Sequence, residues 1–173
     1  MDLQVVYRDS NGEPGWEARF GAQSWPCAIG RSGVRETKVE GDGATPAGCW
    51  PIRELFYRPD RLARPETVFP CSALRPEDGW CDAPDDPRYN RPVGLPYEAR
   101  HERLWRDDEI YDCILVLGYN DDPVVPGVGS AIFLHVARPD FAPTEGCVAL
   151  RRADLLDFLS AAEADTRVCI ALP

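Results

Sequence analysis

Residues 133–150 read Phe133-Leu134-His135-Val136-Ala137-Arg138-Pro139-Asp140-Phe141-Ala142-Pro143-Thr144-Glu145-Gly146-Cys147-Val148-Ala149-Leu150. One apolar run enters this stretch and another leaves it, which predicts two strands joined by a loop. His135, one of two histidines in the chain, lies near the end of the first strand, and Cys147 follows twelve positions later. This arrangement can bring an imidazole beside a thiol.

The thiol is the candidate nucleophile of this stretch. A free thiol has a pKa of about 8.5, so little thiolate exists at neutral pH without a neighbouring base. We therefore predict that His135 activates Cys147. Gly146 lets the backbone approach a bound carbonyl closely, so the amides of Gly146 and Cys147 are predicted to form an oxyanion hole. A buried cysteine that acts only as a small hydrophobe is the alternative interpretation.

The segment Thr144-Glu145-Gly146-Cys147-Val148, with a strand histidine upstream, resembles the active-site signature of the L,D-transpeptidase (YkuD/ErfK) family, usually written Ser/Thr-His-Gly-Cys-Val/Ile-Arg. The segment 41–52 resembles the family's Thr-Pro-x-Gly-x-Phe-x-Ile hairpin, and a helix and a final strand follow the cysteine in the family's order. The resemblance covers about residues 25–52 and 111–173. It implies a cysteine acyltransferase that acts on peptidoglycan stem peptides or muropeptides through a thioester, and that carbapenems can acylate.

Three positions depart from the family pattern. Val136 stands where a glycine usually follows the histidine, Glu145 replaces the histidine before Gly-Cys, and Ala149 replaces the arginine or asparagine two positions after the cysteine. The nucleophile and base carry over while the substrate-contacting positions do not, which indicates a divergent branch. A hydrolytic L,D-carboxypeptidase with the same site and an inactive peptidoglycan-binding protein therefore stay open as alternatives.

The remaining patterns predict a mainly β (α+β) fold, a mixed β-sandwich or partly open barrel in a single domain over residues 1–173. A hairpin is expected from strands at 3–7 and 16–20 around the turn Asn11-Gly12. Short strands are expected at 27–30 and 166–170, a central strand at 114–117, and an amphipathic helix at 153–162. The helix should cover one face of the sheet.

The segment from about 53 to 110 is predicted to be an irregular insertion. Nine of the seventeen prolines lie between Pro51 and Pro96, and proline removes backbone donors, so regular sheet is not expected there. Trp80 and Tyr89 either line a substrate cleft or only anchor this loop to the core. The full set of candidate substrate contacts is Trp80, Tyr89, Asn90, Tyr119, Asn120, Arg138 and Thr144.

Composition excludes several classes of partner. A net charge of −10 disfavours nucleic acid and anionic membranes as partners. The sequence contains no apolar run of about 20 residues, so no membrane span is predicted.

The cysteines and histidines indicate reduced thiols with neither a disulfide framework nor a metal site, since seven cysteines include no Cys-x-x-Cys pair and only two histidines are present. No cofactor is expected. Arg31, Arg35 and Lys38 are expected to be solvated, and His101 to lie at the surface.

The first ten residues resemble a strand and carry neither a basic leader nor an apolar segment. As written, the sequence therefore predicts a cytoplasmic protein, and a periplasmic or cell-envelope one if a leader has been removed. In the cytoplasm, where amine acceptors are scarce, hydrolysis would be expected to compete well with transfer.

Overall fold

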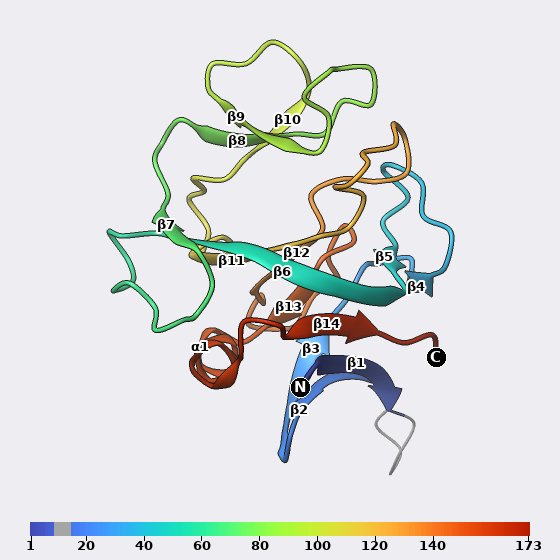
Figure 1. The fold of residues 1–173 in the computed structure, drawn as a ribbon, viewed down its shortest axis with the longest axis vertical. Coiled ribbons are helices and arrows are strands. Elements are labelled where there is room, and N and C mark those ends of the chain that lie inside the picture. Colours follow the sequence, from blue (N-terminus) through green and yellow to red (C-terminus); the bar gives the residue numbers. More distant parts are fainter. Residues whose placement is uncertain (9–14) are drawn as a thin grey trace.

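Strands make up most of the regular secondary structure (Figure 1). The computed structural model describes residues 1–8 and 15–173. In chain order the described elements are β1 (Leu3–Arg8), β2 (Gly15–Phe20), β3 (Gln23–Ala28), β4 (Val34–Arg35), β5 (Thr45–Pro46), β6 (Gly48–Tyr57), β7 (Cys71–Ala73), β8 (Asp78–Cys81), β9 (Arg91–Gly94), β10 (His101–Arg103), β11 (Cys113–Leu117), β12 (Phe133–Val136), β13 (Val148–Leu150), α1 (Arg152–Ala161) and β14 (Arg167–Ile170). The predicted mainly β fold with a C-terminal helix is confirmed.

The largest sheet closes on itself. Its strands follow the order β11-β12-β13-β3-β2-β1-β14-β6, and β6 pairs again with β11. β6 makes both pairings because it is long: residues 48–51 pair with β14, and residues 52–57 pair with β11. The fold is therefore the barrel form of the predicted architecture, closed rather than partly open.

The strands predicted for the first hairpin and for the centre of the sheet are present. β1 and β2 pair antiparallel, whereas the predicted Asn11-Gly12 turn lies outside the described residues. β11 is buried along its whole length and has β12 on one side and β6 on the other. This explains its continuous apolar sequence, since both of its faces are covered.

Successive residues of β11, β12 and β13 point to opposite faces of the barrel wall. In β12, Leu134 and Val136 join the core inside the barrel, whereas Phe133 joins a second apolar cluster on the outer face. Cys147, directly before β13, belongs to the same outer cluster. Because side chains alternate along a strand, His135 faces the same outer side as Phe133.

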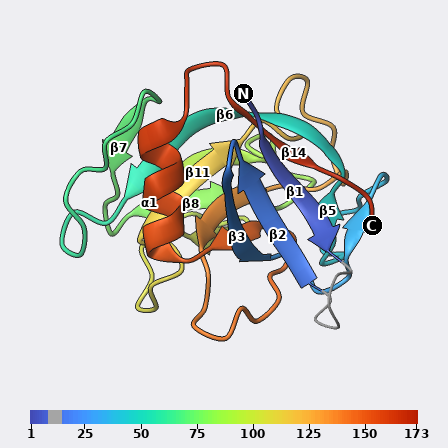
Figure 2. The same ribbon diagram turned by 90° about the horizontal axis from the view of Figure 1, so that it is seen from below.

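The helix α1 lies against one side of the barrel (Figure 2), and it packs on β12. Its buried residues are Leu155, Phe158 and Leu159, and the Phe158 ring meets Phe20 of β2 edge-to-face with centroids 5.2 Å apart. The helix thus closes one side of the barrel core, as its apolar spacing predicted. Within the described residues, no helix combines the length and the apolar character needed to cross a membrane.

The expectation that residues 53–110 form no regular sheet is wrong. β8 pairs antiparallel with both β9 and β10, and these strands form a small sheet that stands over the barrel (Figure 1). Prolines are compatible with this sheet because Pro92 lies in β9, which is an edge strand and leaves one side free of hydrogen-bond partners. The small sheet covers the outer cluster on the barrel wall.

The expectation that all cysteines are reduced is also wrong. Cys49 of β6 and Cys169 of β14 lie opposite each other in the antiparallel pair and form a disulfide. They are 120 positions apart in the chain, so only the strand register brings them together. The free cysteines are Cys27, Cys71, Cys81, Cys113 and Cys147.

We expect five thiols to react with a thiol reagent when the protein is denatured without reductant, and seven after reduction. The difference follows from the cross-strand disulfide, which denaturant alone does not cleave. A thiol-specific chromophore read at both steps measures it. Cys49→Ala should give equal counts with and without reductant; seven thiols in unreduced wild-type protein would contradict the pairing.

Candidate active site

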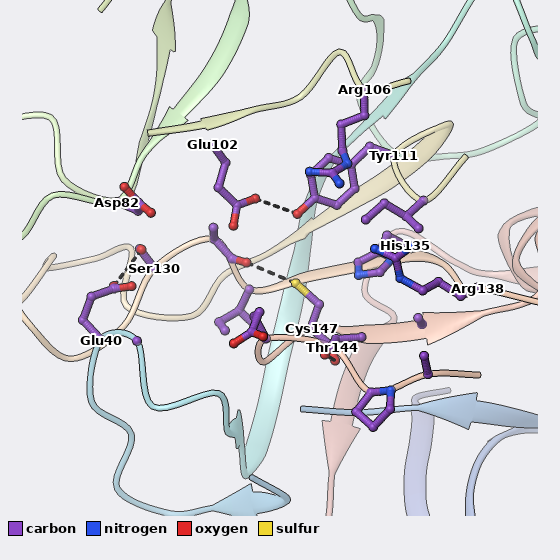
Figure 3. A pocket seen from close by; sticks show the side chains of 18 of the residues that line it. Glu40, Asp82, Glu102, Arg106, Tyr111, Ser130, His135, Arg138, Thr144 and Cys147 are labelled. Carbon is purple, nitrogen blue, oxygen red and sulfur yellow. Dashed lines mark hydrogen bonds between the residues drawn. The ribbon is translucent and has the colours of Figure 1, made fainter. Parts of the chain in front are cut away.

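A cavity of about 510 Å³ lies between the outer face of the barrel wall and the small sheet. Cys147 and His135 both line it, and both side chains point into it from the barrel wall (Figure 3). Above them the cavity is bounded by Glu102 of β10 and by Tyr111. The two residues singled out in the sequence therefore share one cavity.

The Cys147 thiol is neutral in the resting structure. Its Sγ–H donates to the Ala131 carbonyl oxygen at 3.3 Å, and the Phe133 N–H donates to Sγ at 3.4 Å. Burial raises the pKa of Cys147 to about 12; the charge of Glu102 adds to the rise, while the Phe133 N–H and the charge of Lys38 oppose it. A base and a source of positive charge are therefore needed to make this thiol nucleophilic.

His135 is held as a neutral imidazole. Its Nδ1 lies 2.9 Å from the Val136 carbonyl oxygen. A carbonyl can only accept, so Nδ1 carries the proton and Nε2 is left with a free lone pair. Burial lowers the pKa of His135 to about 4, and the Tyr111 ring packs edge-on against the imidazole at 5.4 Å. This is the protonation state that a general base requires.

The strand register sets the separation of His135 and Cys147. β12 and β13 are parallel, with His135 opposite Ala149, so Cys147 lies two residues, about 7 Å along the strand, from the level of His135. Accordingly, no hydrogen bond joins the two side chains among those found in the described residues. Such contacts often tighten only when substrate is bound.

Thr144 holds the loop before Cys147 in place through hydrogen bonds. The Thr144 hydroxyl donates to the Cys147 carbonyl oxygen at 2.6 Å and accepts from the Gly146 N–H at 3.1 Å. Backbone bonds from Thr144 N–H to Ile29 and from Arg31 N–H to Thr144 tie this loop to the chain after β3. The Gly146 amide, predicted to be an oxyanion donor, is therefore already engaged in this structure, and the Thr144 hydroxyl is not free for substrate.

Gly146 occupies a backbone conformation that favours glycine. Its φ is +140°, and a Cβ there would lie 2.8 Å from the Ala44 carbonyl oxygen. We expect Gly146→Ala to lower the unfolding free energy by about 1–3 kcal/mol and to reduce turnover at least tenfold, because the Cys147 loop must shift. Urea unfolding and steady-state rates measure both; Gly127→Ala, also at positive φ but with open space around its Cβ position, is the control that should keep its turnover. Equal turnover losses in the two variants would contradict a role of this glycine at the nucleophile.

Glu145 points into solvent rather than toward the thiol. Its side chain is 77% exposed, and its carboxylate pairs with Arg31 Nε at 2.9 Å. We expect Glu145→Gln to change the catalytic rate by less than about tenfold, since an exposed charge is screened by water. Steady-state kinetics measures this; a hundredfold loss would place the carboxylate in the reaction.

Five of the predicted substrate contacts lie behind the cavity wall. Asn90 accepts from Trp80 Nε1 and from the Ala131 N–H, both at 3.0 Å, and donates to the carbonyl oxygens of Tyr119 and Asn120. Tyr89 donates to Glu40. None of the five, Trp80, Tyr89, Asn90, Tyr119 and Asn120, is part of the cavity lining. Through the bond from the Ala131 N–H, Asn90 holds the Ala131 segment in place beside the thiol. That these five residues contact substrate stays a prediction.

Charged residues that the sequence analysis missed, or expected to be solvated, line the cavity. Lys38 is buried with its ammonium 2.7 Å from Asp42 Oδ1, contrary to the expectation that it is solvated. Glu102 accepts from the Tyr111 hydroxyl at 2.6 Å, and burial raises its pKa. Of the predicted contacts, Arg138 and Thr144 do line the cavity. No local pattern marks Lys38 or Glu102, since each comes from a polar stretch far from residues 133–150.

The cavity has no metal-site geometry: within the described residues, no group of three or more His, Cys, Asp or Glu side chains could hold an ion. The fold and the cavity together define a β-barrel domain that carries a thiol and a neutral imidazole on one face of the barrel wall. Comparison with family models then identifies the family: the model for the L,D-transpeptidase catalytic domain (YkuD) matches residues 3–170. The chain belongs to this family, whose members are enzymes that act on peptidoglycan peptides. No curated protein matches the chain.

Proposed function

We propose that the protein is a cysteine acyltransferase of the L,D-transpeptidase type, with Cys147 as nucleophile and His135 as general base. The observation that carries the proposal is the cavity shared by the Cys147 thiol and the unprotonated Nε2 side of His135. Family membership supports peptidoglycan stem peptides as the acyl donors.

The reaction would proceed in two halves. His135 Nε2 takes the thiol proton as Sγ attacks the peptide carbonyl, which forms the S–C bond and places the electron pair of the C=O π bond on oxygen. Collapse of this intermediate breaks the C–N bond, and His135 returns the proton to the leaving amine. The nitrogen of an amine acceptor then attacks the thioester carbonyl and forms a new C–N bond as the S–C bond breaks. His135 takes the amine proton and passes it to Sγ, which regenerates the thiol.

The mixed charge of the cavity wall supports a donor that carries both amine and carboxylate groups, as stem peptides do. Arg106 is committed to Asp108 through two hydrogen bonds of 2.8 Å. Arg138 approaches the same carboxylate only to 3.7 Å and is half exposed. Arg138 is therefore the cation best placed to pair with the carboxylate of a departing terminal residue near His135.

Hydrolysis by the same site is the second candidate. Ala149 lines the cavity opposite His135 in the strand pair, where the family pattern has a longer polar side chain. A methyl group there provides no donor to hold an acceptor amine, whereas water needs little binding surface. A product that is shortened by its terminal D-residue, without cross-linking, would be the result.

Purified protein incubated with defined tetrapeptide muropeptides, with and without an added D-amino acid, tests the proposal by mass spectrometry. Cross-linked dimers or exchange of the terminal residue support acyl transfer, and tripeptides support the hydrolytic candidate. Cys147→Ala should form none of these products. Wild-type protein that binds the peptides but leaves them intact would overturn both candidates in favour of a binding protein.

A further inference from the structure

Lys38 brings a buried ammonium to the loop that carries the nucleophile. It lies between β4 and β5, its side chain is 4% exposed, and it lines the same cavity as Cys147. Its stem packs over Gly129, where a Cβ would come within 2.8 Å of Lys38 Cε. At its tip, Nζ would lie 3.5 Å from a Cβ on Gly146. The positive charge therefore lies beside the residue that precedes the thiol.

The ammonium is held in place by a preorganised carboxylate. Asp42 Oδ1 accepts from Lys38 Nζ at 2.7 Å and from the Ala44 N–H, and Asp42 Oδ2 accepts from the Val39 N–H. Burial alone would raise the pKa of Asp42, but these three hydrogen bonds outweigh it and hold the pKa below its usual value. Among the described residues, Asp42 accounts for the one hydrogen bond found at Nζ, which has three protons to donate.

The oxyanion of an attacked carbonyl needs a donor in this cavity. Of the two backbone donors expected there, the Gly146 N–H is engaged by the Thr144 hydroxyl. This leaves the Cys147 N–H, and an oxyanion is stabilised further by a second donor. Donors fixed where charge develops are worth most when they are shielded from water, and the Lys38 ammonium is both buried and fixed.

We propose that Lys38 is a catalytic residue that donates a hydrogen bond from its ammonium to the carbonyl oxygen attacked by Cys147. This inference rests on the proposed acyl transfer. As the Sγ–C bond forms, the electron pair of the C=O π bond moves to oxygen, and Lys38 keeps its proton while it stabilises that O⁻. When the oxyanion collapses and the C–N bond breaks, His135 supplies the proton of the leaving amine, so Lys38 ends the step unchanged.

The charge balance of the cavity gives Lys38 a second effect. The carboxylates on the described wall are Glu40, Asp82, Glu102 and Glu145, against the guanidinium groups of Arg100, Arg106 and Arg138. Water screens the charge of the exposed Glu145, so without Lys38 the wall would keep three carboxylates against three guanidinium groups and no net positive charge to favour a thiolate. The cations nearest His135 do not replace it, because Arg106 is committed to Asp108 and the charge of the half-exposed Arg138 is screened by water.

The first test needs no substrate. Cys147 is alkylated with iodoacetamide at pH 8, and the modified peptide is quantified by mass spectrometry in wild type, Lys38→Gln and Lys38→Arg. Glutamine can still donate to Asp42 but has no charge, so alkylation should slow about tenfold, while arginine should stay within about threefold of wild type. Arg31→Gln is the matched control: it removes an exposed cation beside Glu145 and should also stay within about threefold.

The second test measures single-turnover acylation by a tetrapeptide. Lys38→Gln should slow acylation at least about a hundredfold with little change in KM, because an oxyanion donor acts in the transition state. Melting curves for each variant identify loss of folding; if glutamine unfolds the protein, Lys38→Met and the arginine variant carry the comparison. Wild-type acylation rates in folded Lys38→Gln would overturn the inference. If no peptide acylates Cys147 of the wild-type protein, the proposed function is overturned instead. The alkylation rates would still report on Lys38.

Discussion

Replacing Cys147 by serine is expected to reduce product formation by at least about 10⁴-fold. The reason is that a neutral hydroxyl is a much weaker nucleophile than a thiol whose proton His135 takes during the attack. The side chain is nearly isosteric and the site is buried, so the fold should be retained. Product formation is followed by mass spectrometry, and circular dichroism checks the fold.

Covalent labelling distinguishes this thiol from the others. Cys27 and Cys113 are as deeply buried and have pKa values raised to about 12 by burial, like Cys147, but neither lines the cavity. We therefore expect a carbapenem to add its mass to Cys147 and not to these two. Cys113→Ser is the matched control and should keep both the adduct and the activity. An adduct on Cys81 or Cys113 instead of Cys147 would sink the assignment of the nucleophile.

Replacing His135 by glutamine is expected to slow turnover by about 10²–10⁴-fold, the usual contribution of a general base. Glutamine can still donate to the Val136 carbonyl oxygen but cannot take the thiol proton. The other histidine provides the control: His101→Gln should keep wild-type turnover, because His101 lies outside this cavity. Rates measured at saturating peptide decide the matter, and full activity of His135→Gln would show that the base lies elsewhere.

His135 should also make stability depend on pH. Its pKa is lowered by burial from about 6.5 to about 4 in the folded protein, so between these values the unfolded chain binds a proton that the folded chain does not. The contribution is fully present above about pH 6.5 and is lost as the pH falls toward 4, by up to about 3 kcal/mol. Urea unfolding at several pH values should show a steeper loss in wild type than in His135→Gln; parallel curves would contradict a buried neutral imidazole.

Local patterns in the sequence were sufficient to single out Cys147, His135 and the elements that carry them. Each strand around the site is a short apolar run between turn residues, and the side-chain period of two places Cys147 and His135 on one face once the strands pair. The glycine before the thiol is explained by its positive φ. These features depend on neighbours within a few positions, which is why a sequence alone reveals them.

The sheet over the barrel was missed because proline content is a statement about composition, while tolerance of proline depends on the position of a strand. Pro92 lies in an edge strand, where a missing N–H is harmless. The disulfide was missed for a related reason. Cys49 and Cys169 are neighbours only through the register of β6 and β14.

The sequence by itself determined that a thiol and an imidazole lie on one face of a β-rich domain, because strand periodicity is local. Only the tertiary structure decided what surrounds them. Lys38 and Glu102 come from loops and strands far apart in the chain and meet Cys147 because the barrel closes and the small sheet folds over it. The same closure buries these groups, and burial is what makes Cys147 a neutral thiol, His135 a neutral base and the Lys38 ammonium a strong local charge.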